Sequence, residues 1–157
     1  MSYARPASIH VLYLLLPRYL FKPRASALGQ ATFENIEALA TEFATSITAT
    51  AIRFVEYGPD PAMLVCHGRK GRKWFNRPQL IPERWFPRKE LDIDSLAFDV
   101  LFGQERRSRR ALVDAETWFD SREAGRFELY EQSFKISDEN VLSLLIFTDE
   151  EMLEDAG

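Results

Sequence analysis

Apolar residues recur at helical spacing in two adjacent segments of the chain. Segment 32–43 gathers its apolar side chains on one face and predicts an amphipathic helix with Thr32 as its N-cap. After a short turn, Ser46 is placed to cap a second helix, which runs from Ile47 to about Tyr57 and ends at Gly58. Two short helices across such a turn are typical of a helix-turn-helix unit.

The pattern changes to short strands after Pro61. An apolar run at 62–66, turn residues at 68–71 and basic and aromatic residues at 72–75 predict a β-hairpin. Strands are also expected over 111–119, 127–136 and 140–147. The last of these is apolar enough to be placed centrally in its sheet.

The remaining segments predict one more helix and several irregular stretches. Segment 94–102 is expected to be helical, with Asp94 or Ser95 as its cap. Segments 24–31 and 76–90 are expected to be loops, the second because it contains three prolines. Helices and strands in separate blocks indicate an α+β fold with an antiparallel sheet.

The Gly58–Pro61 stretch has the composition of a linker and divides the expected domains. Residues 1–13 show no clear pattern, and residues 14–58 form the predicted helical module. Residues 62–148 form the mixed module, and 149–157 are expected to be a solvated acidic tail.

Charge is distributed unevenly along the 157 residues, although the net charge is only −4. Residues 61–90 carry eight basic and two acidic side chains, a local charge of +6, whereas residues 91–157 carry −10. The acidic whole argues against tight non-specific binding to nucleic acids, but the basic middle can form a local patch. No apolar run approaches the ~18 residues of a membrane span, so we expect a cytoplasmic protein without a membrane partner.

The chain holds few groups for metal binding or nucleophilic catalysis. It has one cysteine, Cys66, and two histidines, His10 and His67, and no His-Glu-x-x-His motif. Cys66 and His67 are adjacent, so in a strand their side chains point to opposite faces and cannot act as a nucleophile–base pair. We therefore expect no metal, no cofactor and no catalytic residue, and an enzyme of another type is the least favoured alternative.

Two segments, LLLPRYLFKPR from Leu14 and TFENIEALATEFATSITATAIRFVE from Thr32, resemble the ImmA/IrrE family of bacterial metallo-endopeptidases. The resemblance implies a helix-turn-helix module followed by a GAF-like sensor domain, in proteins of stress response and transcriptional regulation. Later segments fit that sensor domain in order, namely AMLVCHGRKGRKWF, LDIDSLAFDVLF, AETWF and ENVLSLLIF.

The chain departs from this family where the zinc site belongs. The His-Glu-x-x-His helix of the family would precede residue 1, and the position of its third ligand, a Glu, falls near Pro6, where nothing matches. The resemblance therefore implies the non-catalytic part of such a protein. Either a truncated or frameshifted gene or an independent paralogue of these modules would explain the pattern.

Three functional readings follow from the sequence and the resemblance. In the first, the GAF-like module binds a small ligand or a protein partner, with Arg72, Trp74 and Trp118 as candidate contacts; the alternative is that the tryptophans only pack in the core. In the second, the helix-turn-helix binds DNA through Thr48, Thr50 and Arg53, although a single basic side chain also fits a purely structural helix pair. The third is the unrecognised enzyme. Apolar residues at 11–21 also predict self-association.

Overall fold

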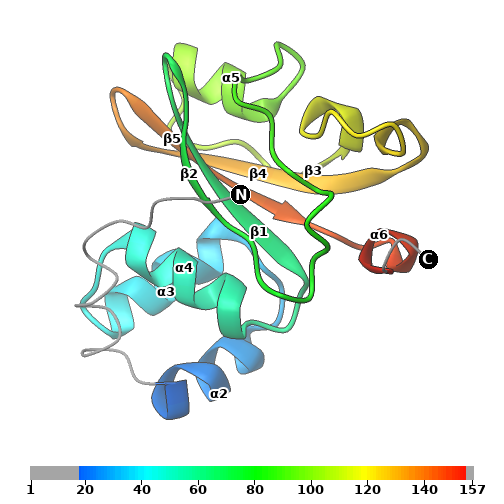
Figure 1. Ribbon diagram of the computed structural model, residues 1–157. Coiled ribbons are helices and arrows are strands. Elements are labelled where there is room, and N and C mark those ends of the chain that lie inside the picture. Colours follow the sequence, from blue (N-terminus) through cyan, green and yellow to red (C-terminus); the bar gives the residue numbers. More distant parts are fainter. Residues whose placement is uncertain (1–17, 155–157) are drawn as a thin grey trace.

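Five antiparallel strands form one sheet in the computed structural model, which describes residues 18–154 (Figure 1). The spatial order is β2-β1-β5-β4-β3. Bounds of the strands are β1 Ala62–Gly68, β2 Gly71–Asn76, β3 Ala111–Asp114, β4 Glu128–Ser137 and β5 Asn140–Ile146. The expected central position of the last strand is confirmed, because β5 is the middle strand and Val141 to Ile146 are buried.

Two hairpins set the register of the sheet. β1 and β2 join at Gly68 and Gly71, which are register partners, and β4 and β5 join at the Ser137–Asn140 pair. Gly71 has a φ of +133°, a conformation that favours glycine, and the backbone of Lys89 passes close beside it. The predicted hairpin over 62–75 is therefore confirmed.

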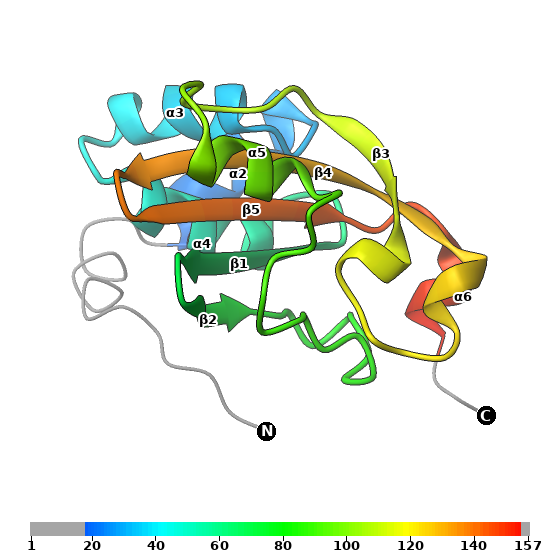
Figure 2. The ribbon, with the colours of Figure 1, turned by 90° about the horizontal axis from the view of Figure 1, so that it is seen from above.

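Three helices cover one face of the sheet, which we call the helix face (Figures 1 and 2). They are α2 (Arg18–Leu28), α3 (Phe33–Glu42) and α4 (Ile47–Tyr57). The hydroxyl of Thr32 accepts a hydrogen bond from the Asn35 N–H, and that of Ser46 accepts one from the Ala49 N–H, which confirms both predicted N-caps. Phe33 stacks on Phe134 of β4, with 5.4 Å between the ring centroids.

The opposite face, which we call the loop face, is covered mainly by irregular chain and short helices (Figure 2). These are the long segment 77–95, α5 (Leu96–Phe102), η1 (Ala115–Thr117), η2 (Ala124–Arg126) and α6 (Glu150–Leu153). Ser95 caps α5 by accepting from the Phe98 N–H, as one of the two expected caps. Trp85 is fully buried here and donates its indole N–H to the carbonyl of Met152 at 2.6 Å.

Three local expectations from the sequence were wrong. Part of the expected loop at 24–31 lies in α2, because Phe21 and Ala25 lie one turn apart and are both buried despite Pro23. The strand expected over 111–119 ends at Asp114, where η1 begins. The acidic tail forms α6 with Met152 buried, so it is not simply solvated; residues 155–157 lie outside the described part.

The α+β class is confirmed, and the helices and the sheet share one hydrophobic cluster. That cluster contains side chains of α2, α3 and α4 together with Leu64, Phe134, Leu142 and Leu144 of the strands. The expected boundary at Gly58–Pro61 is the connection between α4 and β1. Apolar side chains of the helices and of the sheet therefore pack together across this connection.

Candidate functional site

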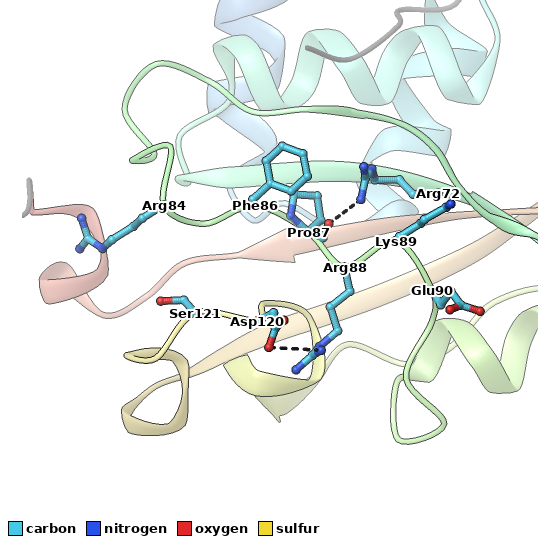
Figure 3. A pocket seen from close by; sticks show the side chains of 9 residues that line it. All are labelled: Arg72, Arg84, Phe86, Pro87, Arg88, Lys89, Glu90, Asp120 and Ser121. Atoms are coloured by element: carbon cyan, nitrogen blue, oxygen red, sulfur yellow. Dashed lines mark hydrogen bonds and ion pairs between the residues drawn. The ribbon is translucent and has the colours of Figure 1, made fainter. Parts of the chain in front are cut away.

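A cavity of about 520 Å³ opens on the loop face, at the edge of the sheet that β2 forms. It is bounded by β2, by the segment between β2 and α5, and by the turn that follows η1 (Figure 3). Its lining consists of Arg72, Arg84, Phe86, Pro87, Arg88, Lys89, Glu90, Asp120 and Ser121. Four of these side chains are basic and two are acidic, so the cavity carries an excess of positive charge.

The wall formed by residues 86–89 is fixed by backbone hydrogen bonds. The Arg72 N–H donates to the Lys89 carbonyl at 2.6 Å, and the Arg88 N–H donates to the Trp118 carbonyl at 2.8 Å. The ring of His67 contacts the same segment, with 3.0 Å between its Nε2 and the Arg88 carbonyl oxygen. An irregular segment held at several backbone positions gives the cavity a defined shape before any ligand arrives.

The guanidinium of Arg72 contacts this wall directly. One terminal nitrogen, Nη1, donates to the Pro87 carbonyl at 2.7 Å, and the guanidinium carbon lies 4.9 Å from the centroid of the Phe86 ring. Partial burial lowers the pKa of Arg72 from its ordinary value, but the guanidinium stays cationic at neutral pH. The site therefore presents a fixed positive charge beside an aromatic ring.

The other arginines of the cavity are paired with carboxylates. Arg88 Nη1 lies 3.8 Å from Asp120 Oδ1, and Arg88 Nε donates to the Glu116 carbonyl at 2.9 Å. Arg84 Nε lies 3.1 Å from Glu123 Oε2. Figure 3 shows Arg88 reaching Asp120 on one side of the 86–89 segment and Arg72 on the other.

Beneath the cavity wall lies a buried polar layer. His67 has no exposed surface, and its ring meets the Trp118 ring edge-on with 5.6 Å between centroids. Burial and the charge of Arg72 together lower the pKa of His67 to about 4, against the opposing effect of the hydrogen bond to the Arg88 carbonyl. The imidazole is therefore neutral at pH 7, and its Nε2–H is the donor to the Arg88 carbonyl.

Glu131 of β4 is the acceptor that organises this layer. Its carboxylate accepts from the N–H groups of Leu96 and Ala97 at 3.1 and 2.7 Å, which begin α5. It also accepts from the Trp118 indole at 3.0 Å and from the Ser133 hydroxyl at 2.7 Å. Burial raises the pKa of Glu131, and these four donors oppose that rise.

Gln132, the next residue of β4, also accepts a hydrogen bond from the start of a helix, on the helix face. The side-chain oxygen of Gln132 accepts from the Phe33 N–H at 2.7 Å, at the start of α3. Its amide nitrogen donates to the Glu34 carboxylate at 3.1 Å. Partial burial raises the pKa of Glu34, but this hydrogen bond and the nearby Arg107 hold it below its ordinary value. Adjacent residues of one strand thus fix a helix start on each face.

The structure separates the three candidate ligand contacts. Arg72 lines the cavity, and Trp118 lies buried beneath its wall. Trp74 is half-buried against the helix-face cluster, so it does not contribute to this cavity. Sequence reasoning missed the other lining residues, namely 84, 86–90, 120 and 121. The +6 charge of residues 61–90 was the available signal for the basic ones among them.

The three candidate DNA contacts lie on α4, and two are inaccessible. Thr50 is buried and donates its hydroxyl to the Ser46 carbonyl at 2.7 Å. Arg53 is 1% exposed, with its guanidinium 4.4 Å from the centroid of the Tyr57 ring. Only Thr48 retains intermediate exposure, so this surface of α4 offers little to a nucleic acid in this conformation.

Several other expected features have definite positions or fall outside the described part. Within residues 18–154, no cluster of three or more His, Cys, Asp or Glu side chains is arranged to hold a metal ion. None of the helices in that range has the length and apolar character needed to cross a bilayer. His10 and residues 11–17 of the expected association segment lie outside the described residues, while Tyr19 and Leu20 are exposed and Phe21 is buried.

Comparison with known protein-family models and with curated proteins finds no match to this chain. The ImmA/IrrE resemblance therefore stays a prediction, which rests on the sequence segments alone.

Proposed function

We propose that this chain is a non-catalytic regulatory module that senses a small ligand in the loop-face cavity, as part of an ImmA/IrrE-like regulator. The observation that carries the proposal is a cavity of about 520 Å³, within the range of small-molecule sites, with an anchored wall and an exposed aromatic ring. Phe86 is 38% exposed and supplies apolar contact, while the surrounding cations supply orientation.

Hydrogen bonds connect the 86–89 wall of the cavity to the buried polar layer, so ligand binding in the cavity can affect that layer. Arg88 uses its backbone N–H and carbonyl to contact Trp118 and His67, and Trp118 in turn donates to Glu131. Glu131 holds the first two N–H groups of α5. A ligand that displaces the Arg88 backbone would therefore change the hydrogen bonds of the buried layer and the position of α5.

A thermal-shift screen tests whether the cavity binds small molecules at all. The library contains neutral, cationic and anionic compounds of fewer than about 20 heavy atoms, which fit a cavity of this class. We expect at least one compound to raise the Tm of the wild type. That shift should vanish in Ser121→Trp, where an indole fills the cavity, and persist in Ser137→Trp, a control at an exposed position at the end of β4. Absence of any stabilising compound, or equal shifts in Ser121→Trp, contradicts the proposal.

The non-catalytic part of the proposal has a separate test. Incubation of the chain with a fluorogenic peptide mixture and Zn²⁺ should give no hydrolysis above the rate of a heat-denatured sample. Hydrolysis that co-purifies with the chain and is abolished by chelation would contradict it.

A further inference from the structure

Part of the positive charge of the cavity has no ion-pair partner among residues 18–154. Arg84 and Arg88 have carboxylate partners, but within residues 18–154 no carboxylate lies within ion-pairing distance of Arg72 or Lys89. Figure 3 shows Arg72 and Lys89 at one end of the cavity, with the Arg72 guanidinium directed towards Pro87, and Arg84 at the other end. Two cations at one end of the cavity leave an excess of positive charge there, which a bound anion would reduce.

The guanidinium of Arg72 is also oriented for recognition. Its Nη1 donates a hydrogen bond to the Pro87 carbonyl, and the guanidinium lies against the aromatic rings of Phe75 and Phe86. Its remaining N–H groups have no acceptor among residues 18–154, and the planar guanidinium that carries them is anchored through Nη1. A planar fork of N–H donors matches the two oxygens of a carboxylate or phosphate.

We propose that the ligand of this cavity is a small organic oxyanion, whose carboxylate or phosphate binds Arg72 and Lys89 while its apolar part packs against Phe86. This inference rests on the proposed function, because it names the class of ligand that the sensor binds. Partial burial of the Arg72 site strengthens the attraction relative to a fully solvated ion pair.

Calorimetric titrations at fixed ionic strength test the charge requirement with matched probes. Benzoate and phenyl phosphate carry the oxyanion on an aromatic ring, benzamide is the neutral counterpart of benzoate, and inorganic phosphate lacks the ring. We expect benzoate or phenyl phosphate to bind at least about tenfold more tightly than benzamide. Inorganic phosphate should bind more weakly than phenyl phosphate, and the stronger of the two aromatic anions identifies the oxyanion as carboxylate or phosphate.

Matched variants locate the binding. Arg72→Gln should weaken binding of the better aromatic anion about tenfold or more, Arg72→Lys less, and Lys89→Gln several-fold. Lys70→Gln removes an exposed charge from the nearby hairpin turn without touching the cavity and should leave affinity unchanged. Lys89 is exposed, so Lys89→Gln gives a readout even if Arg72→Gln fails to fold.

The outcomes separate this inference from the proposed function. Equal binding of benzamide and benzoate, or equal losses in Lys70→Gln and Lys89→Gln, overturns the oxyanion proposal while a small-molecule sensor stands. If neither aromatic anion binds but neutral compounds of the thermal-shift screen do, the inference alone fails. If that screen also finds no compound, the proposed function fails with it.

Discussion

The two faces of the sheet solve the same structural problem with different chemistry. On the helix face, the neutral amide of Gln132 accepts the first N–H group of α3. On the loop face, the adjacent Glu131 accepts two N–H groups of α5 with a buried carboxylate. The comparison teaches that buried Glu131 and His67 form hydrogen bonds to covering segments on the loop face, whereas the buried ionisable side chains Arg53 and Cys66 lie on the helix face.

The difference follows from what covers each face. The helices α2, α3 and α4 satisfy most of their own backbone hydrogen bonds, so the helix face is closed largely by apolar packing. The irregular segments of the loop face cannot do this, and side chains such as His67 must accept or donate in their place. A sheet face covered by irregular segments therefore needs buried polar side chains that satisfy the backbone groups of those segments.

Replacement of Glu131 should have the largest effect. Glu131→Ala leaves three N–H donors without their acceptor, while the Ser133 hydroxyl can still donate to Ser143, and we expect the free energy of unfolding to fall by about 4 kcal/mol in urea titrations. Glu131→Gln keeps one acceptor oxygen and should lose roughly half as much. A loss under about 1 kcal/mol for Glu131→Ala would mean that the loop face does not depend on this carboxylate.

Cys66 tests how firmly the helices cover the opposite face. Its thiol is buried in the helix-face cluster, and burial raises its pKa to about 11, against the effect of Lys73. At pH 8 the thiol should react with a thiol-specific reagent about a hundredfold more slowly than in the urea-unfolded chain, because the thiolate is scarce. Similar rates in the two states would show that α2–α4 readily separate from the sheet.

Gln132→Ala should cost less than Glu131→Ala. It leaves the Phe33 N–H without its acceptor, while the Thr32 cap of α3 remains, so we expect a loss of about 2 kcal/mol. Urea titrations of both variants under the same conditions compare the faces directly. A larger loss for Gln132→Ala would reverse the ranking of the two faces.

The smallest effect concerns pH and arises on the loop face. The pKa of His67 is about 4 in the folded chain and about 6.5 when unfolded, so the unfolded state binds more protons between these values. Stability should therefore fall as the pH drops from 6.5 towards 4, by roughly 1 kcal/mol between pH 7 and 5.5. Glu131, with its raised pKa, acts in the opposite direction, since its stabilisation is lost as pH rises through the folded pKa.

His67→Gln isolates the histidine contribution. The Gln side chain can donate to the Arg88 carbonyl as Nε2 does, but it does not titrate. The difference in unfolding free energy between wild type and His67→Gln should narrow as the pH falls. A difference that stays constant from pH 7 to 5.5 would show that His67 does not titrate below its unfolded value.

Local signals explain what the sequence predicted well. The hydroxyls of Thr32 and Ser46 accept hydrogen bonds from N–H groups three residues further along the chain, so a few adjacent residues suffice to predict both caps. The apolar character of 141–146 likewise reports burial on both faces without knowledge of its neighbours. Such features need no tertiary information.

Contacts between distant segments explain what it missed. α2 contains Pro23, and its helical state depends on Phe21 packing against Phe54 of α4, with 6.4 Å between the ring centroids. Met152 is buried beside Trp85, 67 residues earlier in the chain. The cavity is lined by Arg72 of β2, by residues 84 and 86–90 and by residues 120–121, and no periodic pattern in any one of these segments indicates that they meet.

The three tryptophans allow one measurement to decide whether the loop face is the ligand-binding face. Trp85 and Trp118 belong to its buried cluster, whereas Trp74 packs against the helix-face cluster. In spectra of chain labelled with ¹⁵N-tryptophan, saturating phenyl phosphate should shift the indole signals of Trp118 and Trp85. The Trp118 carbonyl accepts a hydrogen bond from the Arg88 N–H, and Trp85 directly precedes Phe86. The Trp74 signal should stay in place. A shift confined to Trp74, or no shift of any indole at concentrations that saturate binding, would contradict the assignment of the ligand site to this face.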